Sequence, residues 1–357
     1  MGGLGFVIGV GGTSRALNGA RVCRRAEIHE AAKEGRVNDV RELIESGVDV
    51  DERDEEGWTA LMWGSRVGDL EVVKLLHGKG ADLMARNDKG STSLHHASHW
   101  QSEPVVNALL SWLDEGEGVN EQNSVGWTPL HWAAKAGSSR ITKLLLDSGS
   151  SVNVRHVLGA APLHEATNSG DVEVAQLLLD AGADVNMTSS TGATPLLSAA
   201  YMGSIELCEL FIDAGGSLAI RDEGGDTPLI CAARGGFEDV VEMLIERGAR
   251  VNEKNKAGWT ALHEACRWGR DDVIGILVAD ENVILENRNE NGETALHLAA
   301  MYGASYGVPD VIESLVEAGA SVDAVDSSGK TPTDIVLLST RAEKDEVLNA
   351  LKPRIAT

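Results

Sequence analysis

Histidines, cysteines and tryptophans are the residues through which this sequence could do chemistry. Six of the histidines occupy the last place of a phrase related to Thr-Pro-Leu-His: His29, His95, His131, His164, His263 and His297. Two others, His96 and His99, are spaced by one helical turn and could supply two ligands to a metal ion. Because no cysteine or third ligand converges with them in the sequence, we expect no metal site.

The cysteines give no sign of a disulfide framework or of a nucleophile. Cys23, Cys208, Cys231 and Cys266 show no Cys-x-x-Cys spacing, which favours a reducing compartment. The last three fall where sister segments carry Val, Leu or Ala, so we expect them to be small core residues. The sequence also lacks Gly-x-Ser-x-Gly, His-Glu-x-x-His and Walker motifs. We therefore expect no enzyme and no cofactor.

The tryptophans gather in one recurring phrase. It reads GWTALMWGSRVG at 57–68, GWTPLHWAAKAG at 126–137 and GWTALHEACRWG at 258–269. Tryptophan, tyrosine and arginine are the residue types most enriched at the hot spots of protein interfaces. An indole at such a place can also simply cover the neighbouring turn, so packing and partner binding are both open for each tryptophan.

The phrase belongs to a repeat whose period is mostly 33 residues, with three intervals of 36, 34 and 37. We number each copy so that position six is, in order, Ala26, Thr59, Thr92, Thr128, Ala161, Thr194, Thr227, Thr260, Thr294 and Thr331. Thr-Pro-Leu-His is intact at 128–131, and a later phrase, LLLDAGADVN, stands at 177–186. A 33-residue period with these phrases resembles the ankyrin repeat.

The resemblance covers residues 21–352 and implies an all-α, ankyrin-repeat solenoid of about ten stacked helix-turn-helix units joined by β-turn or hairpin loops. Local features agree with it. Thr128 suits a helix N-cap, Pro129 suits the first helical turn, and Gly137 suits the left-handed residue that ends a helix. One such unit cannot bury its own apolar face, so stability must come from stacking on neighbours.

Outside the repeat domain we expect a Gly-rich, disordered leader at 1–20 and a short tail at 353–357. The residues before Glu27 contain no acid and several arginines, so an organellar import signal is the alternative for the leader. Polar caps are expected at both ends of the repeat domain. Three insertions are expected to form loops: 111–118, 280–283 and 303–309.

The charge of the chain limits its partners. It has 55 acidic and 31 basic residues, a formal net charge of −24, which would repel nucleic acid. No apolar run approaches the ~20 residues that a membrane-spanning helix needs. We therefore expect a monomer in the cytoplasm or nucleus, without a nucleic-acid partner or a membrane span.

The resemblance also implies where a partner would bind. In ankyrin proteins the turn tips and first helices line a concave groove, and positions five, thirteen and fourteen contact partners. Seven of the eight tryptophans map to that side, with basic residues at position thirteen. We expect non-catalytic binding of a protein or peptide, acidic or phosphorylated, by Trp58, Trp63, Arg66, Trp100, Trp127, Trp132, Lys135, Tyr201, Arg234, Trp259, Arg267, Trp268 and Tyr302.

Two alternatives use other features. A scaffold or inhibitor would act through the acidic convex face or the inserted loops. A methyl-lysine reader is the other, because tryptophans at positions five and ten resemble the cage of ankyrin modules in some histone methyltransferases. That family completes the cage with an acid at position thirteen, whereas this chain has Arg66 and Lys135, which would repel a methylammonium ion.

One modification site follows from the resemblance as well. The segment LLDAGADVN at 178–186 is similar to the consensus that asparaginyl hydroxylases recognise in ankyrin repeats, with an acid and an aliphatic residue directly before Asn186. Asn153 and Asn252 lack that acid. We therefore expect Asn186 to be a hydroxylation substrate.

Overall fold

The computed structural model describes residues 27–114, 116–306, 309–338 and 344–352. The expected leader at 1–20, Cys23 and the tail at 353–357 lie outside the described residues. The chain divides into two compact units. Unit 1 is Met1–Val157 with Asp180–Gly182, and unit 2 is Leu158–Leu179 with Ala183–Thr357.

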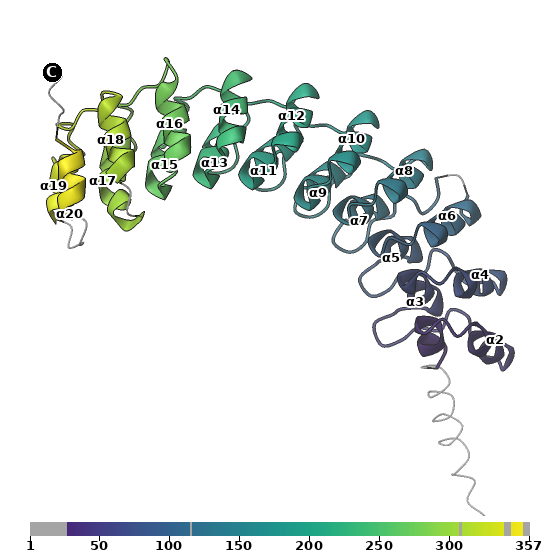
Figure 1. Ribbon diagram of the computed structural model, residues 1–357. Helices are drawn as coiled ribbons and strands as arrows, with labels where there is room; N and C mark the ends of the chain where they lie inside the picture. The colour runs from purple at the N-terminus through teal and green to yellow at the C-terminus, as the bar shows by residue number, and fades with distance from the viewer. Residues whose placement is uncertain (1–26, 115, 307–308, 339–343, 353–357) are drawn as a thin grey trace, which may run out of the picture. The chain divides into compact units, whose positions relative to one another are not determined.

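Unit 1 is built from helix pairs. Its described helices are one at 27–33 and then α2 (Val37–Glu45), α3 (Ala60–Val67), α4 (Leu70–Gly78), α5 (Ser93–His99), α6 (Glu103–Trp112), α7 (Pro129–Lys135) and α8 (Ser139–Asp147). The first helices of successive pairs pack in order, α3 on α5 and α5 on α7. The second helices form another row, with α4 on α6 and α6 on α8 (Figure 1).

Unit 2 repeats the same plan. Its described helices are α9 (Pro162–Ser169), α10 (Val172–Asp180), α11 (Pro195–Met202), α12 (Ile205–Asp213), α13 (Pro228–Gly235), α14 (Glu238–Glu246), α15 (Ala261–Trp268), α16 (Asp271–Ala279), α17 (Ala295–Tyr306), α18 (Pro309–Glu317), α19 (Pro332–Leu338) and α20 (Lys344–Ala350). Odd-numbered helices pack on odd-numbered ones and even on even. With no β-strand among the described residues, the predicted all-α fold of stacked helix pairs is confirmed.

The helix ends follow the sequence signals. The hydroxyl of Thr59 accepts a hydrogen bond from the backbone N–H of Met62, so Thr59 caps α3. Gly68 ends the same helix with φ 83°, a left-handed conformation that suits glycine. Pro129 and Pro162 occupy the first positions of α7 and α9, where a missing N–H costs no helical hydrogen bond.

The loops between pairs end in tight hairpin turns, as expected. In one of them the backbone N–H of Gly126 donates to the carbonyl of Asn123 (2.9 Å), and the N–H of Asn123 donates to the carbonyl of Trp127 (2.9 Å). Gly126 has φ +82°, and a Cβ there would lie 2.9 Å from the Cα of His156. The turn therefore holds Trp127 against the tip of the following hairpin.

The histidines of the Thr-Pro-Leu-His phrase bridge successive repeats. Nδ1 of His95 accepts from the backbone N–H of Thr92 (3.1 Å), which leaves the proton on Nε2 to donate to the carbonyl of Trp127 (3.0 Å). His263 and His297 make the same two kinds of contact. Burial lowers the pKa of His95 and of His263 to about 4, so both are neutral near pH 7. These imidazoles are structural, as their register indicated.

The cores are filled by small and branched apolar side chains, and the cysteines belong to them. Cys208, Cys231 and Cys266 are buried free thiols. Burial raises the pKa of the Cys208 and Cys231 thiols to about 12, and it raises the pKa of Cys266 further. A thiol that cannot ionise near neutral pH is a poor nucleophile.

The insertions do not all form loops. Residues 280–283 follow α16 in a turn. Of the expected loop at 111–118, Ser111 and Trp112 are instead the last residues of α6, and the described part of 113–118 follows the helix. Residues 303–306, however, continue α17, which has 12 residues where α15 has 8, so the expectation of a loop there is wrong. No helix in the described part of the chain is both long and apolar enough to span a bilayer.

Candidate binding surface

Two tryptophans are locked together at the start of α3. The carboxylate of Asp54 accepts from the backbone N–H of Trp58 (2.8 Å) with one oxygen and from the indole N–H of Trp63 (2.9 Å) with the other. The two rings then stack with centroids 4.4 Å apart and an interplanar angle of 24°. One turn carboxylate thus fixes the tryptophans of positions five and ten as a pair.

A similar pair lies at the start of α7. Here Asn123 takes the place of the aspartate and accepts from the backbone N–H of Trp127 (2.9 Å). The rings of Trp127 and Trp132 have centroids 4.4 Å apart at 43°. Trp127 also stacks on His156, with centroids 5.2 Å apart.

Two histidines of α5 connect these pairs. His96 stacks on Trp58 at 4.0 Å and 25°, while the ring of His99 meets Trp132 at 4.3 Å and Trp100 at 5.1 Å in edge-on geometry. We call the resulting surface of α3, α5 and α7 the aromatic array; its members are Trp58, Trp63, His96, His99, Trp100, Trp127 and Trp132.

Sequence reasoning considered His96 and His99 only as metal ligands and missed this role. The signal was present in the register, because they stand at positions ten and thirteen of their repeat, the places of Trp63 and Arg66. Among the residues that the structure describes, no three His, Cys, Asp or Glu side chains converge as metal ligands would.

Cations lie on the faces of the array. The guanidinium carbon of Arg66 is 5.6, 5.1 and 4.9 Å from the ring centroids of Trp58, Trp63 and Trp100. Lys135 Nζ lies 4.9 Å from the centroid of Trp127. Such distances allow cation–π attraction. Within the described part of unit 1, no carboxylate pairs with Arg66 or Lys135, although acidic residues outnumber basic ones in the chain.

The array histidines carry no charge near neutral pH. Burial, followed by the charges of His95 and Arg66, lowers the pKa of His96 to about 3, so that its Nε2 is free to accept from the amide of Asn87 (3.3 Å). Burial also lowers the pKa of His99, with smaller contributions from Lys135 and Arg66. The positive charge on this surface therefore comes from Arg66 and the lysines.

The tryptophans of the array differ in exposure. Trp58 is only 9% exposed and packs against Met62 and Ala85, so packing accounts for most of its surface. Trp63, Trp127 and Trp132 are half-buried. Trp100 is 51% exposed. Trp100 is thus the indole of the array most able to lose water contact on binding.

A smaller cluster forms in unit 2. The guanidinium carbon of Arg267 lies 4.8, 5.5 and 5.8 Å from the ring centroids of Trp259, Trp268 and Tyr302. Trp268 is 39% exposed. Tyr201, on α11, is 62% exposed and contacts no other aromatic ring among the described residues.

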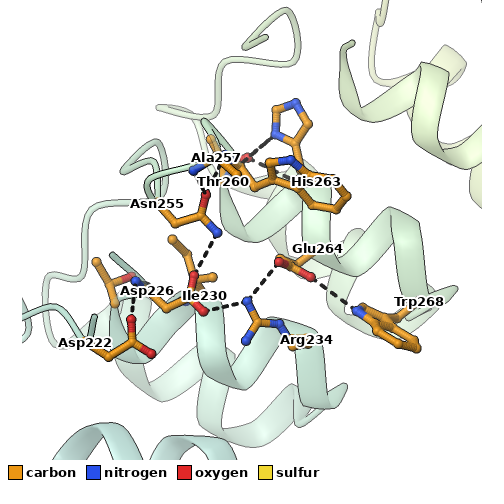
Figure 2. A network of polar contacts seen from close by, with 12 residues as sticks. Asp222, Asp226, Ile230, Arg234, Asn255, Ala257, Thr260, His263, Glu264 and Trp268 are labelled. Atoms are coloured by element: carbon orange, nitrogen blue, oxygen red, sulfur yellow. Dashed lines mark hydrogen bonds and ion pairs between the residues drawn. The ribbon is translucent and has the colours of Figure 1, made fainter. Parts of the chain in front are cut away.

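Arg234 is partly buried and is paired with two carboxylates. Its guanidinium donates to Asp226 (2.5 Å) and to Glu264 (2.8 Å), two carboxylates whose side chains are 7% and 5% exposed, as Figure 2 shows. Burial by itself would lower the pKa of Arg234, but the hydrogen bonds and charges of these partners raise it. The second oxygen of Glu264 accepts from the indole N–H of Trp268 (3.2 Å). Arg234 therefore supports Trp268 through Glu264.

Asn186 belongs to a ladder of asparagines that tie each turn to the next. Its amide donates to the carbonyl of Gly215 (3.0 Å) and its oxygen accepts from the backbone N–H of Ser217 (2.8 Å). Asn120 and Asn252 make equivalent pairs of hydrogen bonds in their own repeats. The hydroxylation of Asn186 stays a prediction.

Comparisons with known proteins agree on the nature of the repeats. A 31% identical stretch of 120 residues, 34% of this chain, matches 8% of the mouse inactive serine/threonine-protein kinase TEX14. A 29% identical stretch of 119 residues, 33% of this chain, matches 25% of the human ankyrin repeat, SAM and basic leucine zipper domain-containing protein 1. A 30% identical stretch of 135 residues, 31% of this chain, matches 11% of a Caenorhabditis elegans homolog of transient receptor potential cation channel subfamily A member 1.

The chain thus spans a quarter or less of the length of these relatives. A family model that describes three consecutive ankyrin repeats matches four segments of the chain. They are residues 28–114, 109–189, 182–255 and 250–326, which together make up most of its length. Ankyrin repeats generally mediate protein–protein interaction, and the family is typically non-catalytic. The protein is a member of the ankyrin-repeat family.

Proposed function

We propose that the aromatic array of unit 1 binds an acidic segment of another protein, with Arg66 and Lys135 pairing with its negative groups. The observation that carries the proposal is the state of Arg66. This cation rests on three indole faces in a chain of net charge −24 and has no carboxylate partner within the described part of unit 1. A partner's acid would supply the missing counter-charge.

The contrast with Arg234 supports this interpretation. Both arginines stand at position thirteen of their repeats. Arg234 pairs with two buried carboxylates, whereas Arg66 lies on aromatic rings and pairs with no carboxylate in the part of unit 1 that the structure describes. An arginine pre-positioned on a ring loses less side-chain freedom when a ligand arrives, which favours binding.

The apolar contribution would come from the exposed indoles. Trp100 lies against Arg66 and Trp132 against Lys135. Covering a large aromatic ring at the centre of an interface typically contributes ~2 kcal/mol or more. The cluster of Trp259, Arg267, Trp268 and Tyr302 in unit 2, with Tyr201, would be a second contact region of the same chemistry. Arg234 would serve there as a positioning residue.

The methyl-lysine alternative is disfavoured by the same geometry. Arg66 already lies over the rings of Trp58 and Trp63, where a methylammonium ion would have to sit. A second cation in that place would be repelled. The alternative of a scaffold that binds through acidic side chains of the outer helices is tested in the same experiment.

Capture from lysate of the source cells tests the proposal. The baits are the wild type, the array variant Arg66→Glu/Trp100→Ala, and an outer-helix variant, Glu42→Lys/Glu71→Lys, whose glutamates are exposed on α2 and α4. Each must first give a native circular dichroism spectrum. We expect partners that the array variant loses and the outer-helix variant keeps. The reverse pattern would assign binding to the acidic outer face.

A further inference from the structure

Unit 1 contains a hollow of about 530 Å³ between its first helices and its hairpin tips. This volume is in the range of ligand-binding pockets, roughly 300–1,000 Å³. Its walls include Trp58, Trp100, Trp132 and Val125, contributed by three successive repeats. Five members of the array line this hollow: Trp58, His96, His99, Trp100 and Trp132.

The lining is apolar at the walls and basic at the rim. His96 forms part of the lining and is neutral, because burial and nearby positive groups lower its pKa to about 3. Arg66 and Lys89 supply the charges of the rim, and none of the 13 lining residues is acidic. An apolar group next to a negative charge is complementary to such a site, whereas a cation is not.

An exposed apolar strip leads away from the hollow. Val125, one of its walls, is 45% exposed, and Val157 on the next hairpin tip is 66% exposed. The backbone N–H of Val157 donates to the carbonyl of Val125 (3.0 Å), so the two tips are tied together. A ligand confined to the hollow would leave this strip uncovered, but a chain passing over the tips would cover it.

We infer that the hollow is an anchor pocket for one bulky apolar side chain of an acidic protein segment. Acidic groups beside the anchor pair with Arg66 and Lys89, and the segment continues over Val125 and Val157. This inference rests on the proposed function and adds to it the class of sequence that is recognised: an aromatic or branched aliphatic residue flanked by acids.

Ser124 gives a way to close the pocket without touching the array. Its side chain is exposed, it lines the hollow, and its backbone N–H donates to the carbonyl of Lys89 (2.9 Å). The variant Ser124→Trp fills the hollow from the tip. Ser190→Trp is the matched control, because Ser190 occupies the same repeat position in unit 2, is exposed, and makes the same backbone contact with Leu158 (2.9 Å).

The experiment selects random short peptides displayed on phage against the wild-type protein. Enriched peptides are resynthesised, and their affinities are measured by fluorescence anisotropy with and without replacement of the apolar residue by Ala. On the wild type and on Ser190→Trp we expect this replacement to weaken binding at least about tenfold, because a large apolar side chain is buried. On Ser124→Trp the replacement should change the affinity by less than about twofold.

The outcomes separate the two proposals. Enrichment of acidic peptides without a common bulky apolar residue would overturn the anchor pocket and leave the acidic partner standing. Equal losses on wild type and Ser124→Trp would also overturn the pocket, since the anchor would then sit elsewhere. If Arg66→Glu binds the enriched peptides as tightly as the wild type does, the proposed function fails as well.

Discussion

The guanidinium carbon of Arg66, on α3, lies 4.9 Å from the ring centroid of Trp100, which follows α5 in the next repeat. This contact joins two repeats through a cation and an exposed indole. Arg234 also joins its repeat to the next, but through a carboxylate, that of Glu264. Both arginines stand at position thirteen of their repeats. Removing Arg234 would leave buried carboxylates without a cation, whereas removing Arg66 would leave aromatic rings.

Replacing Arg234 by Met is expected to destabilise unit 2 strongly. The carboxylates of Asp226 and Glu264 would remain buried without their cation, a loss that typically costs about 3–5 kcal/mol. Arg66→Met leaves no carboxylate unpaired in the described part of unit 1 and should cost only ~1 kcal/mol of cation–π attraction. Urea midpoints followed by circular dichroism measure both.

The triple variant Arg234→Met/Asp226→Asn/Glu264→Gln is the control for that comparison. Removing the charges together should recover much of the lost stability, because neutral amides are far cheaper to bury than unpaired carboxylates. If Arg234→Met alone unfolds at the wild-type urea concentration, the network contributes nothing and our account of Arg234 is incorrect.

Two of the three tryptophans that contact Arg66, Trp58 and Trp100, should separate an effect on stability from an effect on binding. Trp58 is 9% exposed, so Trp58→Ala opens a cavity and should cost about 3–5 kcal/mol. Trp100 is 51% exposed, so Trp100→Ala should stay within about 1 kcal/mol of the wild type while weakening partner binding. Thermal unfolding measures the first effect, and affinity for a selected peptide measures the second. Equal unfolding temperatures for the two variants would contradict the assignment of Trp58 to packing and of Trp100 to binding.

Much of the fold could be predicted from the sequence because the same local signals recur in most repeats. Threonine at position six, proline after it and glycine at the helix end each act within a few residues of the chain. The histidine bridges were also predictable in their first half, the contact within the turn. The second contact of each histidine, the hydrogen bond from Nε2 to a carbonyl of the next repeat, depends on how successive repeats pack, which one repeat's sequence does not specify.

The candidate site was predicted less completely for the same reason. An arginine at position thirteen contacts position five of its own repeat and a residue in or directly after the first helix of the next repeat. For Arg234 these are Asp226 and Glu264, whereas Arg66 contacts Trp58 at position five and Trp100 at position fourteen of the next repeat. A single aligned column shows two equivalent arginines. Only the pairing of columns between repeats reveals that one is satisfied and the other is not.

The buried cysteines should be unreactive until the protein unfolds. Burial raises the pKa of Cys208 and Cys231 to about 12, so at mildly alkaline pH the thiolate that attacks a disulfide reagent is scarce. We expect an aromatic disulfide reagent to modify the native Cys23→Ser variant slowly and the urea-unfolded variant fast. Removing Cys23, which lies outside the described residues, keeps its reactivity out of the measurement. Rapid modification of the native variant would mean that a core opens readily.

Acid should destabilise the protein before its carboxylates titrate. In the folded state burial lowers the pKa of His95 and of His263 to about 4, whereas an unfolded histidine titrates near 6.5. Between these values the unfolded chain binds more protons, so the free energy of unfolding must fall as the pH falls. The stabilisation is fully present above about pH 6.5 and is lost progressively toward about pH 4.

The expected size follows from the same linkage. Each of these two histidines should remove on the order of 1–2 kcal/mol between about pH 7 and pH 5, seen as a lower urea midpoint. The variant His263→Asn should be less stable at pH 7, because it loses an imidazole that bridges two repeats, but its midpoint should depend less steeply on pH. A wild-type midpoint that stays constant over this range would mean that the bridging histidines accept protons while folded, and that the bonds from Nδ1 to the turn are not what holds them.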